Sequence, residues 1–368
     1  IDGGVDVLLF ETQQDVLELK AGILGARDAM RERGKTLPII AQVTVDQFAR
    51  MQIFNVDILS ALVSIEAMNV DVFGINCSIG PDLMEPAVEK MSRYAHISLS
   101  VVPNAGLPES ESGKTVFKFE PKKFAEILEY LTLTYGINIV GGCCGTTPEH
   151  ISELAKRLKN RKPKARGPEK KTFIAGVQKA VELDASRSLI RIGERLNVRG
   201  SKKVREAVEN DTGIDMDTLE SIAHEQIDDL GCEIIDVCMD SNQVNTVQTL
   251  CKVVHQISAN IKGALCIDSF QPDALIEAVK YYAGVPILNS ISLEELQPGI
   301  TKLDILLPAT KDFGAFYIAL CTDNKGPADT AEKKLELAKR IVESANKYGI
   351  PPHRLFIDTN VFPIGSES

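Results

Sequence analysis

Three cysteines that follow predicted strands carry the clearest chemistry in this sequence. An apolar run at 137–140, typical of a strand, is followed by two glycines and then by Cys143 and Cys144, with a third glycine after them. Cys77 follows a second apolar run at 72–76. The flanking glycines let the backbone bend sharply, so that both thiols can project toward one point. Three protein ligands around one open position is the pattern of a catalytic zinc ion.

The ordinary alternative is that each cysteine packs as a small apolar residue. Adjacent cysteines are poor disulfide partners, because their Cβ atoms diverge and the ring is strained. The combination of a Gly-Gly-Cys-Cys-Gly strand end with an Asn-Cys-Ser strand end favours zinc over packing. Thr147 and Pro148 then begin a helix as N-cap and first helical residue. We expect His150 on the surface of this helix and not as a ligand.

Length and composition restrict the class of protein. The 368 residues are enough for two domains, and a hydrophobic fraction of 44% supplies their cores. A net charge of −10 argues against a general nucleic-acid surface, and no apolar run predicts a membrane span or a signal peptide. The eight cysteines are spaced too irregularly for a disulfide framework, which favours a reducing cytoplasm. Both ends of the chain lie close to predicted strands, so we expect it to be cut at both ends.

The first part of the chain alternates apolar runs with amphipathic segments, which predicts parallel strands joined by crossover helices. We expect strands at 5–10, 37–43, 72–76, 97–102 and 137–140. Polar residues follow these strands, where a (β/α)8 barrel places its active site: Glu11, Cys77, Asn104, Cys143 and Cys144. The charged segment 160–171 contains two prolines and predicts a linker. It separates a first domain at 1–159 from a second at 172–368.

The second part repeats this alternation. We expect strands at 189–192, 233–237, 264–269, 286–290, 315–320 and 355–358, with clear helices at 272–282 and 329–348 and a weaker one near Leu293. Acidic and amide residues gather at the strand ends: Glu194, Asn197, Asp236, Asp268, Asn289, Asp358 and Asn360. Carboxylates accept N–H bonds from a guanidine-like edge, and amides both donate and accept, so this face suits a pterin ring. Some of these residues, such as Asp358, could instead cap the following helix.

Several motifs resemble known families. The segments 10–12 (Phe-Glu-Thr), 74–78 (Gly-Ile-Asn-Cys-Ser), 103–108 (Pro-Asn-Ala-Gly-Leu-Pro) and 141–147 resemble the homocysteine S-methyltransferase domain. The segments 192–197 (Ile-Gly-Glu-Arg-Leu-Asn), 267–269 (Ile-Asp-Ser), 289–291 (Asn-Ser-Ile) and 356–358 (Phe-Ile-Asp) resemble pterin-binding methyltetrahydrofolate methyltransferase domains. In this order, and over nearly the whole chain, they resemble the cobalamin-dependent methionine synthase family. The resemblance implies an α/β fold of two consecutive (β/α)8 TIM-type barrels, the first lacking its N-terminal strands and the second its C-terminal strands.

The resemblance also implies methyl transfer from 5-methyltetrahydrofolate, by way of cobalamin, to the thiolate of homocysteine, giving methionine. Cys77, Cys143 and Cys144 would hold Zn²⁺, with the homocysteine sulfur in the fourth position. Homocysteine would also contact Glu11, Thr12 and Asn104, and the pterin would be held by Glu194, Asn197, Asp236, Asp268, Asn289, Asp358 and Asn360. Cobalamin would be bound outside this chain, by a further domain or by a separate corrinoid protein.

One departure and two alternatives remain open. Cys238 stands where many relatives carry an amide, so one hydrogen bond to the pterin is either lost or supplied by Asp240. One alternative is a folate–corrinoid-protein methyltransferase of one-carbon metabolism, which would not need the three cysteines. The other is a truncated zinc- and folate-binding module without turnover.

Overall fold

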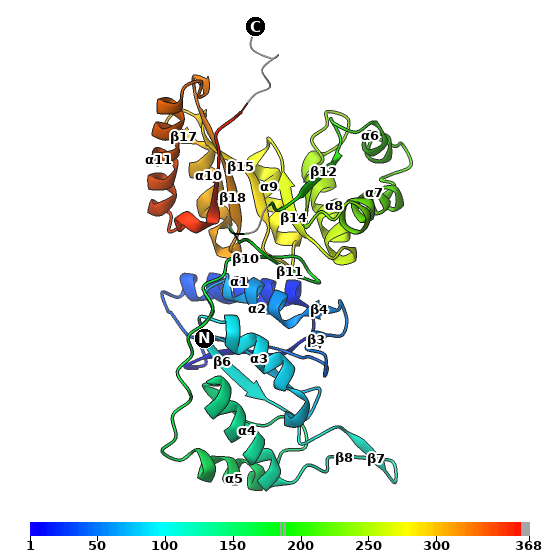
Figure 1. Ribbon diagram of the computed structural model, residues 1–368, viewed down its shortest axis with the longest axis vertical. Helices are drawn as coiled ribbons and strands as arrows, with labels where there is room; N and C mark the ends of the chain where they lie inside the picture. The colour runs from blue at the N-terminus through cyan, green and yellow to red at the C-terminus, as the bar shows by residue number, and fades with distance from the viewer. Residues whose placement is uncertain (185, 187–188, 362–368) are drawn as a thin grey trace. The chain divides into compact units, whose positions relative to one another are not determined.

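The computed structural model describes residues 1–184, 186 and 189–361. Their contacts divide the chain into two compact units. The first consists of Ile1–Lys171 and Val177–Ala180, and the second of Thr172–Gly176 and the described residues from Val181 onward. Each is an α/β unit in which helices connect the strands of a parallel sheet (Figure 1). Within the described part of the chain, every helix is too short or too polar to cross a membrane.

The sheet of the first unit has five parallel strands in the order β1-β2-β5-β6-β9. Every residue of its central strand is buried, as expected for a strand that is covered on both faces. Each strand overlaps one of the predicted strands, although the first begins at Leu8 and not at Val5. Their bounds are β1 (Leu8–Gln13), β2 (Ile39–Val43), β5 (Val72–Asn76), β6 (Ser98–Val102) and β9 (Ile139–Val140).

Two helices of this unit begin at an aspartate whose side chain caps the first turn. Asp15 accepts a hydrogen bond from Leu17 N, and Asp57 accepts one from Leu59 N. The helices are α1 (Val16–Glu32), α2 (Ile58–Glu66), α3 (Glu85–Tyr94), α4 (Pro121–Tyr135) and α5 (Pro148–Leu158). Two hairpins were not predicted, because strands of two or three residues carry too little alternation to be recognised. They pair β3 (Arg50–Met51) with β4 (Val56–Asp57) and β7 (Glu109–Glu111) with β8 (Lys114–Val116).

Residues 160–171 form neither helix nor strand and lie along the first unit. Arg166 Nη1 donates to the carbonyl of Ala95 at 2.8 Å. Lys164 N donates to the carbonyl of Thr132 at 3.3 Å. These bonds hold the segment against the elements on either side of β6.

The sheet of the second unit runs β12-β13-β14-β15-β18, and β18 also pairs with β20 in parallel and with the short β19 in antiparallel direction. The parallel strands are β12 (Ile192–Asn197), β13 (Ile234–Cys238), β14 (Ala264–Asp268), β15 (Ile287–Leu293), β18 (Phe316–Asp323) and β20 (Leu355–Asp358), and β19 is Gly326–Pro327. The helices are α6 (Lys202–Val208), α7 (Met216–His224), α8 (Thr246–Asn260), α9 (Pro272–Ala278), α10 (Lys302–Thr310) and α11 (Ala331–Lys347). Phe173–Ala175 (β10) and Ala180–Glu182 (β11) form a separate two-stranded sheet.

Two predictions for this unit are wrong. The strand predicted at 189–192 begins only at Ile192 and continues to Asn197, so Glu194 and Asn197 lie within β12. The helix predicted near Leu293 is absent, because Leu293 ends β15 and a hairpin of β16 (Glu295–Gln297) and β17 (Ile300–Thr301) precedes α10. A short apolar run does not distinguish strand from helix by its periodicity.

Alternation along the central strands decides where the core lies. In β13 and β14, Ile235, Val237, Leu265 and Ile267 belong to the apolar core that packs against helices such as α8. Successive side chains of a strand point to opposite faces. The residues in between, among them Asp236 and Asp268, therefore point to the other face of the sheet.

Candidate functional site

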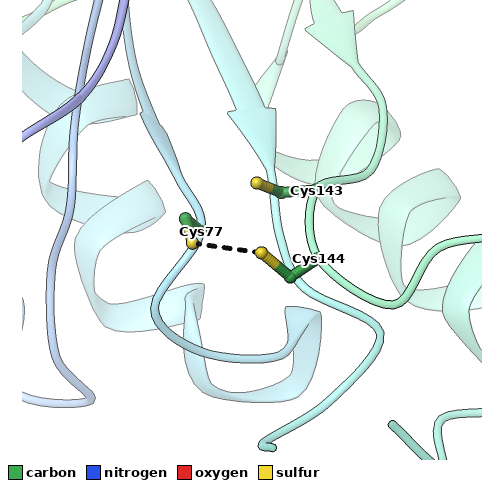
Figure 2. Close-up of side chains that lie close together, drawn as sticks. All are labelled: Cys77, Cys143 and Cys144. Atoms are coloured by element: carbon green, nitrogen blue, oxygen red, sulfur yellow. Dashed lines mark hydrogen bonds between the residues drawn. The ribbon is translucent and has the colours of Figure 1, made fainter. Parts of the chain in front are cut away.

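The three predicted cysteines converge at one edge of the first sheet. The Sγ atoms of Cys77, Cys143 and Cys144 all lie within 4.8 Å of one another, and those of Cys77 and Cys144 are 3.8 Å apart. Figure 2 shows the thiols pointing toward one another, Cys77 from the segment after β5 and the other two from the segment after β9. Cys144 is exposed and the other two are half-buried, so a small molecule can reach the cluster from solvent.

The segment around Cys77 is held in an unusual conformation. Cys77 and Ser78 have φ values of 60° and 63°, which residues other than glycine rarely adopt. Strain of this kind is typical of functional sites. The preceding Asn76 is buried, and its side chain donates to Thr12 Oγ1 and accepts from Thr12 N, both at 2.8 Å. Because of this bridge, Thr12 and the exposed Glu11 lie at the same sheet edge as Cys77.

Asn104 positions the backbone of the other two cysteines. It is 4% exposed, and its Oδ1 accepts a hydrogen bond from Cys144 N at 3.1 Å. On either side, Cys143 N donates to the carbonyl of Pro103 at 2.7 Å, and Ala105 N donates to the carbonyl of Cys144 at 2.9 Å. The segment after β6 thus fixes the turn that carries both thiols.

The glycines of this turn are required by close contacts. A Cβ atom on Gly142 would lie 2.2 Å from Thr146 Cγ2. Gly145 has a φ of 77°, and a Cβ atom there would lie 2.2 Å from Phe117 Cγ. Only glycine fits both positions without displacing its neighbours.

Without a metal ion, the environment of Cys143 disfavours its thiolate form. Burial, together with the nearby Cys77, raises the pKa of the Cys143 thiol to about 12. A bound divalent cation reverses this preference, because it stabilises coordinated thiolates directly. The donor set therefore fits a thiophilic cation.

The prediction that His150 lies on the surface is wrong. His150 is 5% exposed, and its Nδ1 accepts a hydrogen bond from Thr147 N at 3.2 Å. Its Nε2 lies 2.8 Å from the carbonyl oxygen of Phe119. His150 thus closes a capping box at the start of α5, a position where the sequence motif expects Glu or Gln.

A second polar cluster lies on the face of the other sheet that points away from its apolar core. Register pairs Asn197 with Cys238, Cys238 with Asp268, and Asp268 with Asn289. Partners in a ladder point to the same face, so these four side chains form one row. Asp236 lies one step back along β13, beside its partner Cys266. The structure therefore brings together four of the predicted pterin residues: Asn197, Asp236, Asp268 and Asn289.

The carboxyl groups of this face are in an unfavourable environment for charge. Burial, together with the charge of Glu194, raises the pKa of Asp236 to about 6. Burial, together with Asp236, raises the pKa of Asp268 to about 7. Asp236 Oδ1 is buried and has no hydrogen-bond partner among the described residues. An unpaired buried acceptor costs about 1–3 kcal/mol, so this oxygen suits the N–H group of a ligand.

From the sequence, Asp240 was a possible hydrogen-bond partner of the pterin, and in the structure its carboxylate holds a loop. Asp240 is 3% exposed, and its two oxygens accept from Ser269 Oγ at 2.7 Å and from Phe270 N at 2.8 Å. Both oxygens therefore fix the loop after β14. Lys302 is a buried residue that the sequence did not single out, and its Nζ donates to the carbonyl of Ser269 at 3.3 Å. A lysine at the start of a helix is ordinarily expected to be exposed, so nothing in the sequence indicated that Lys302 is buried.

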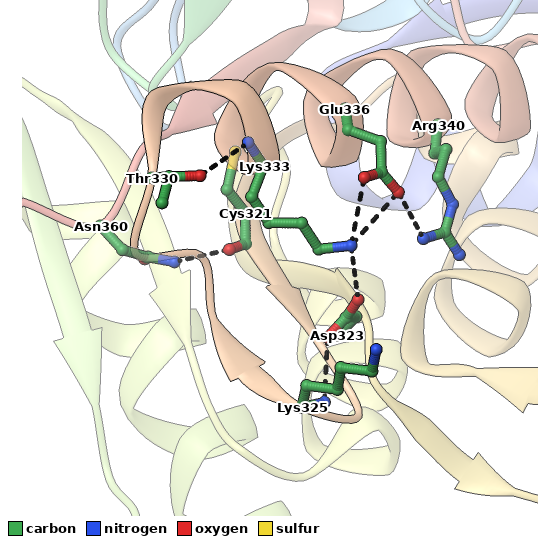
Figure 3. A network of polar contacts seen from close by, with 8 residues as sticks. All are labelled: Cys321, Asp323, Lys325, Thr330, Lys333, Glu336, Arg340 and Asn360. Atoms are coloured by element: carbon green, nitrogen blue, oxygen red, sulfur yellow. Dashed lines mark hydrogen bonds and ion pairs between the residues drawn. The ribbon is translucent and has the colours of Figure 1, made fainter.

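Asp358 and Asn360 lie at the far side of this sheet. The register partner of Asp358 is Leu320 of β18, which lies beyond β15 and its Asn289. Asn360 Nδ2 donates to the carbonyl of Cys321 at 3.2 Å and to Thr322 Oγ1 at 2.9 Å, which joins the end of β20 to β18. Figure 3 shows this contact beside an ion-pair network in which Lys333 contacts Asp323 and Glu336, and Glu336 contacts Arg340.

The two halves of the chain match different protein families. A family model for homocysteine S-methyltransferase matches residues 1–158, and one for pterin binding enzymes matches residues 193–368. Methionine synthase of Mycobacterium tuberculosis (strain ATCC 25618 / H37Rv) is 33% identical over the whole chain, and that of Mycobacterium leprae (strain TN) is 32% identical. The chain spans 30% of the length of each of these relatives.

Solved structures of lower identity also match. One is dihydropteroate synthase from Xanthomonas albilineans in complex with 7,8-dihydropteroate, with 19% identity and a TM-score of 0.36 over 49% of this chain and 63% of that one. Another is the Yersinia pestis enzyme with a pterine-sulfa conjugate, with 19% identity and a TM-score of 0.37 over 53% of this chain and 67% of that one. The family matches thus show that residues 1–158 of this chain are similar to the homocysteine S-methyltransferase family and residues 193–368 to the pterin-binding enzyme family.

Proposed function

We propose that this chain supplies the homocysteine and folate modules of a methionine synthase. The reaction is methyl transfer from 5-methyltetrahydrofolate, by way of cobalamin, to homocysteine, giving methionine. Cobalamin is bound outside this chain, by a further domain or by a separate corrinoid protein. The single observation that carries the proposal is the convergence of three cysteine sulfurs in a module that is similar to the homocysteine S-methyltransferase family.

The sulfur positions fit a zinc ion. A Zn–S distance of about 2.3 Å in a tetrahedron requires sulfurs that are about 3.8 Å apart. Cys77 and Cys144 have this separation, and Cys143 lies close enough to complete the triangle with a small adjustment. When bound, the zinc ion would lower the pKa of the homocysteine thiol and hold it as a nucleophile.

The surrounding residues orient the substrate. Asn104 holds the backbone of Cys144, and would thereby help to orient this cysteine as a zinc ligand. Glu11 is an exposed carboxylate at the same sheet edge and would bind the homocysteine ammonium group. Thr12, which is fixed by hydrogen bonds to Asn76, would line the space between the cysteine cluster and Glu11.

The polar face of the second unit would hold the pterin ring. Asp236 Oδ1 is a buried acceptor that has no hydrogen-bond partner among the described residues, and it would accept a ring N–H. Asp268, with its pKa raised to about 7, would gain or lose a proton near neutral pH while contacting the ring. Asn289 is its neighbour in the row. Glu194, Asn197, Asp358 and Asn360 complete the proposed pterin set at its edges.

The same proposal extends to the fold and the compartment. The parallel sheets of the two units would each be part of a (β/α)8 barrel, the first lacking N-terminal and the second C-terminal strands, with their sites at the carboxyl ends of the strands. The three ligand cysteines must stay reduced to bind zinc, which is consistent with a reducing compartment such as the cytoplasm.

The test separates the two modules with one substitution in each. Cys144→Ser should abolish zinc binding, about one ion per chain in the parent, and leave binding of 5-methyltetrahydrofolate unchanged. Asp268→Ala should weaken folate binding and leave zinc content unchanged. Metal analysis and calorimetric titration provide the two readouts. Cys232→Ser and Asp217→Ala, which change a half-buried cysteine and an exposed aspartate elsewhere, serve as matched controls. A well-folded parent that takes up no zinc would refute the homocysteine module.

A further inference from the structure

His150 is a buried histidine whose two ring nitrogens contact different parts of the first unit. It is 5% exposed, and its ring packs edge-on against Phe124 of α4, with the ring centroids 5.2 Å apart. Its Nδ1 accepts a hydrogen bond from Thr147 N at 3.2 Å, so this nitrogen carries no proton. The proton therefore lies on Nε2, which donates to the carbonyl oxygen of Phe119 at 2.8 Å. One neutral tautomer of the ring thus satisfies both contacts.

A chain of backbone hydrogen bonds leads from this histidine to the cysteine turn. Phe119 N donates to the carbonyl of Ala105 at 3.1 Å, and Ala105 N donates to the carbonyl of Cys144 at 2.9 Å. Ala105 is fully buried, and its neighbour Asn104 accepts from Cys144 N at 3.1 Å. Cys144 is therefore held at both its N–H and its carbonyl. The second of these bonds depends on where Phe119 places Ala105.

His150 closes this chain of bonds into a ring. It follows Cys144 by six residues, in the first turn of α5. The segment 144–150 thus contacts the segment 105–119 at both ends, through Ala105 and through Phe119. Residues 107–118, which include the β7–β8 hairpin, are mostly exposed, so packing constrains them only weakly. His150 anchors the point at which this segment returns to the core.

We propose that His150 is a positioning residue for the metal-binding cysteines and acts on Cys144 through Phe119 and Ala105. This inference rests on the proposed zinc site of the first unit. A tetrahedral site requires its three sulfurs in a narrow range of positions. Groups that orient metal ligands by hydrogen bonding typically change metal affinity by about 10–100-fold. Because His150 acts through two other residues, we expect an effect at the lower end of this range.

The alternative is that His150 serves only as the cap of α5. The two ring nitrogens separate these roles, because Nδ1 contacts the start of the helix and Nε2 contacts Phe119. A purely capping histidine would need only the acceptor at Nδ1. A positioning histidine would also need the donor at Nε2.

Two amide substitutions distinguish the two nitrogens. In His150→Asn the amide oxygen lies near the position of Nδ1 and can cap the helix, but the side chain is too short to reach Phe119. In His150→Gln the amide nitrogen lies near the position of Nε2 and can donate to Phe119. Both variants lose the ring that packs on Phe124. His150→Asn should bind zinc about tenfold more weakly than the parent, and His150→Gln nearly as tightly as the parent.

Three measurements report on the site, and one control tests for a general effect of lost capping. Competition with a chromophoric chelator gives the zinc affinity, and urea unfolding of the metal-free protein gives the stability. The absorption spectrum of the cobalt-loaded protein reports how the thiolates surround the metal, and it should change in His150→Asn but not in His150→Gln. Asp304→Ala breaks a comparable capping box at the start of α10 in the second unit. It should lower stability and leave both metal readouts unchanged.

The outcomes separate this inference from the zinc site itself. If the parent takes up no zinc, the zinc site fails, and the positioning role fails with it. If the parent binds zinc and His150→Asn binds it as tightly, only the positioning role is refuted. An equal loss in the Asn and Gln variants also refutes it, because the packing of the ring would then matter and not its donor. Nitrogen-15 NMR of the parent provides a test without any variant, since a proton on Nδ1 of His150 would contradict the inferred contacts.

Discussion

Removing the side chain of Asn104 should weaken zinc binding without touching a cysteine. In the structure, Asn104 Oδ1 accepts the N–H of Cys144 at 3.1 Å from a position that is 4% exposed. Asn104→Ala removes this acceptor and leaves a gap beside the turn. Cys144 N then has to turn toward water, and the thiol of the same residue moves with it.

The expected magnitude follows from the cost of that bond. A buried N–H that loses its acceptor costs about 1–3 kcal/mol. Loss of a group that orients a metal ligand typically lowers metal affinity about 10–100-fold, which corresponds to about 1.4–2.7 kcal/mol. The two ranges agree, so we expect Asn104→Ala to lower zinc affinity by 10–100-fold, while the chain remains folded.

Competition with a chromophoric chelator measures the zinc affinity, and urea unfolding measures the stability. Asn138→Ala is the matched control, because Asn138 Oδ1 accepts from Leu99 N at 3.0 Å at the other end of β6. It should cost similar stability and leave zinc affinity unchanged. Asn104→Asp keeps an acceptor oxygen and should recover most of the lost affinity. The reasoning is refuted if Asn104→Ala binds zinc as tightly as the parent, or if both alanine variants lose affinity equally.

Two further predictions concern packing and pH. Gly74→Ala should destabilise the first unit by about 1–3 kcal/mol, because its Cβ would lie 1.9 Å from Ser100 Oγ. The control Gly25→Ala in α1 meets nothing within 4 Å and should be neutral or stabilising. Equal urea midpoints for the two variants would contradict this prediction. The pKa of Asp268 is raised to about 7 and that of Asp236 to about 6. The folded protein therefore holds protons that the unfolded chain releases near pH 4. The free energy of unfolding should fall as the pH rises from about 4 to 7. Asp268→Asn should make this fall shallower in urea titrations at several pH values, and an unchanged slope would count against the raised pKa.

Local patterns in the sequence were sufficient for the strand–helix alternation and for the polar residues at strand ends. Apolar runs of strand length, separated by amphipathic segments, predict parallel strands wherever they occur. Cys77, Cys143 and Cys144 stand out for the same reason, since Cys77 directly follows such a run and the other two follow one after a pair of glycines. The ambiguous places were short apolar runs, such as the one before Leu293, whose periodicity fits either element.

Whether a polar side chain is free or engaged was decided only by the tertiary structure. Asn104 meets Cys144 from 40 residues away, and Asn76 meets Thr12 from 64 residues away. Asp240 has both oxygens occupied by the loop after β14, and His150 is buried against Phe119, although the sequence indicated neither contact. The order of apolar and polar residues in a segment specifies its periodicity. A hydrogen bond instead depends on which distant segment the fold brings near enough for donor and acceptor atoms to lie about 3 Å apart. The sequence thus determined the kinds of groups at each strand end, and the fold determined which of them remain available to a ligand.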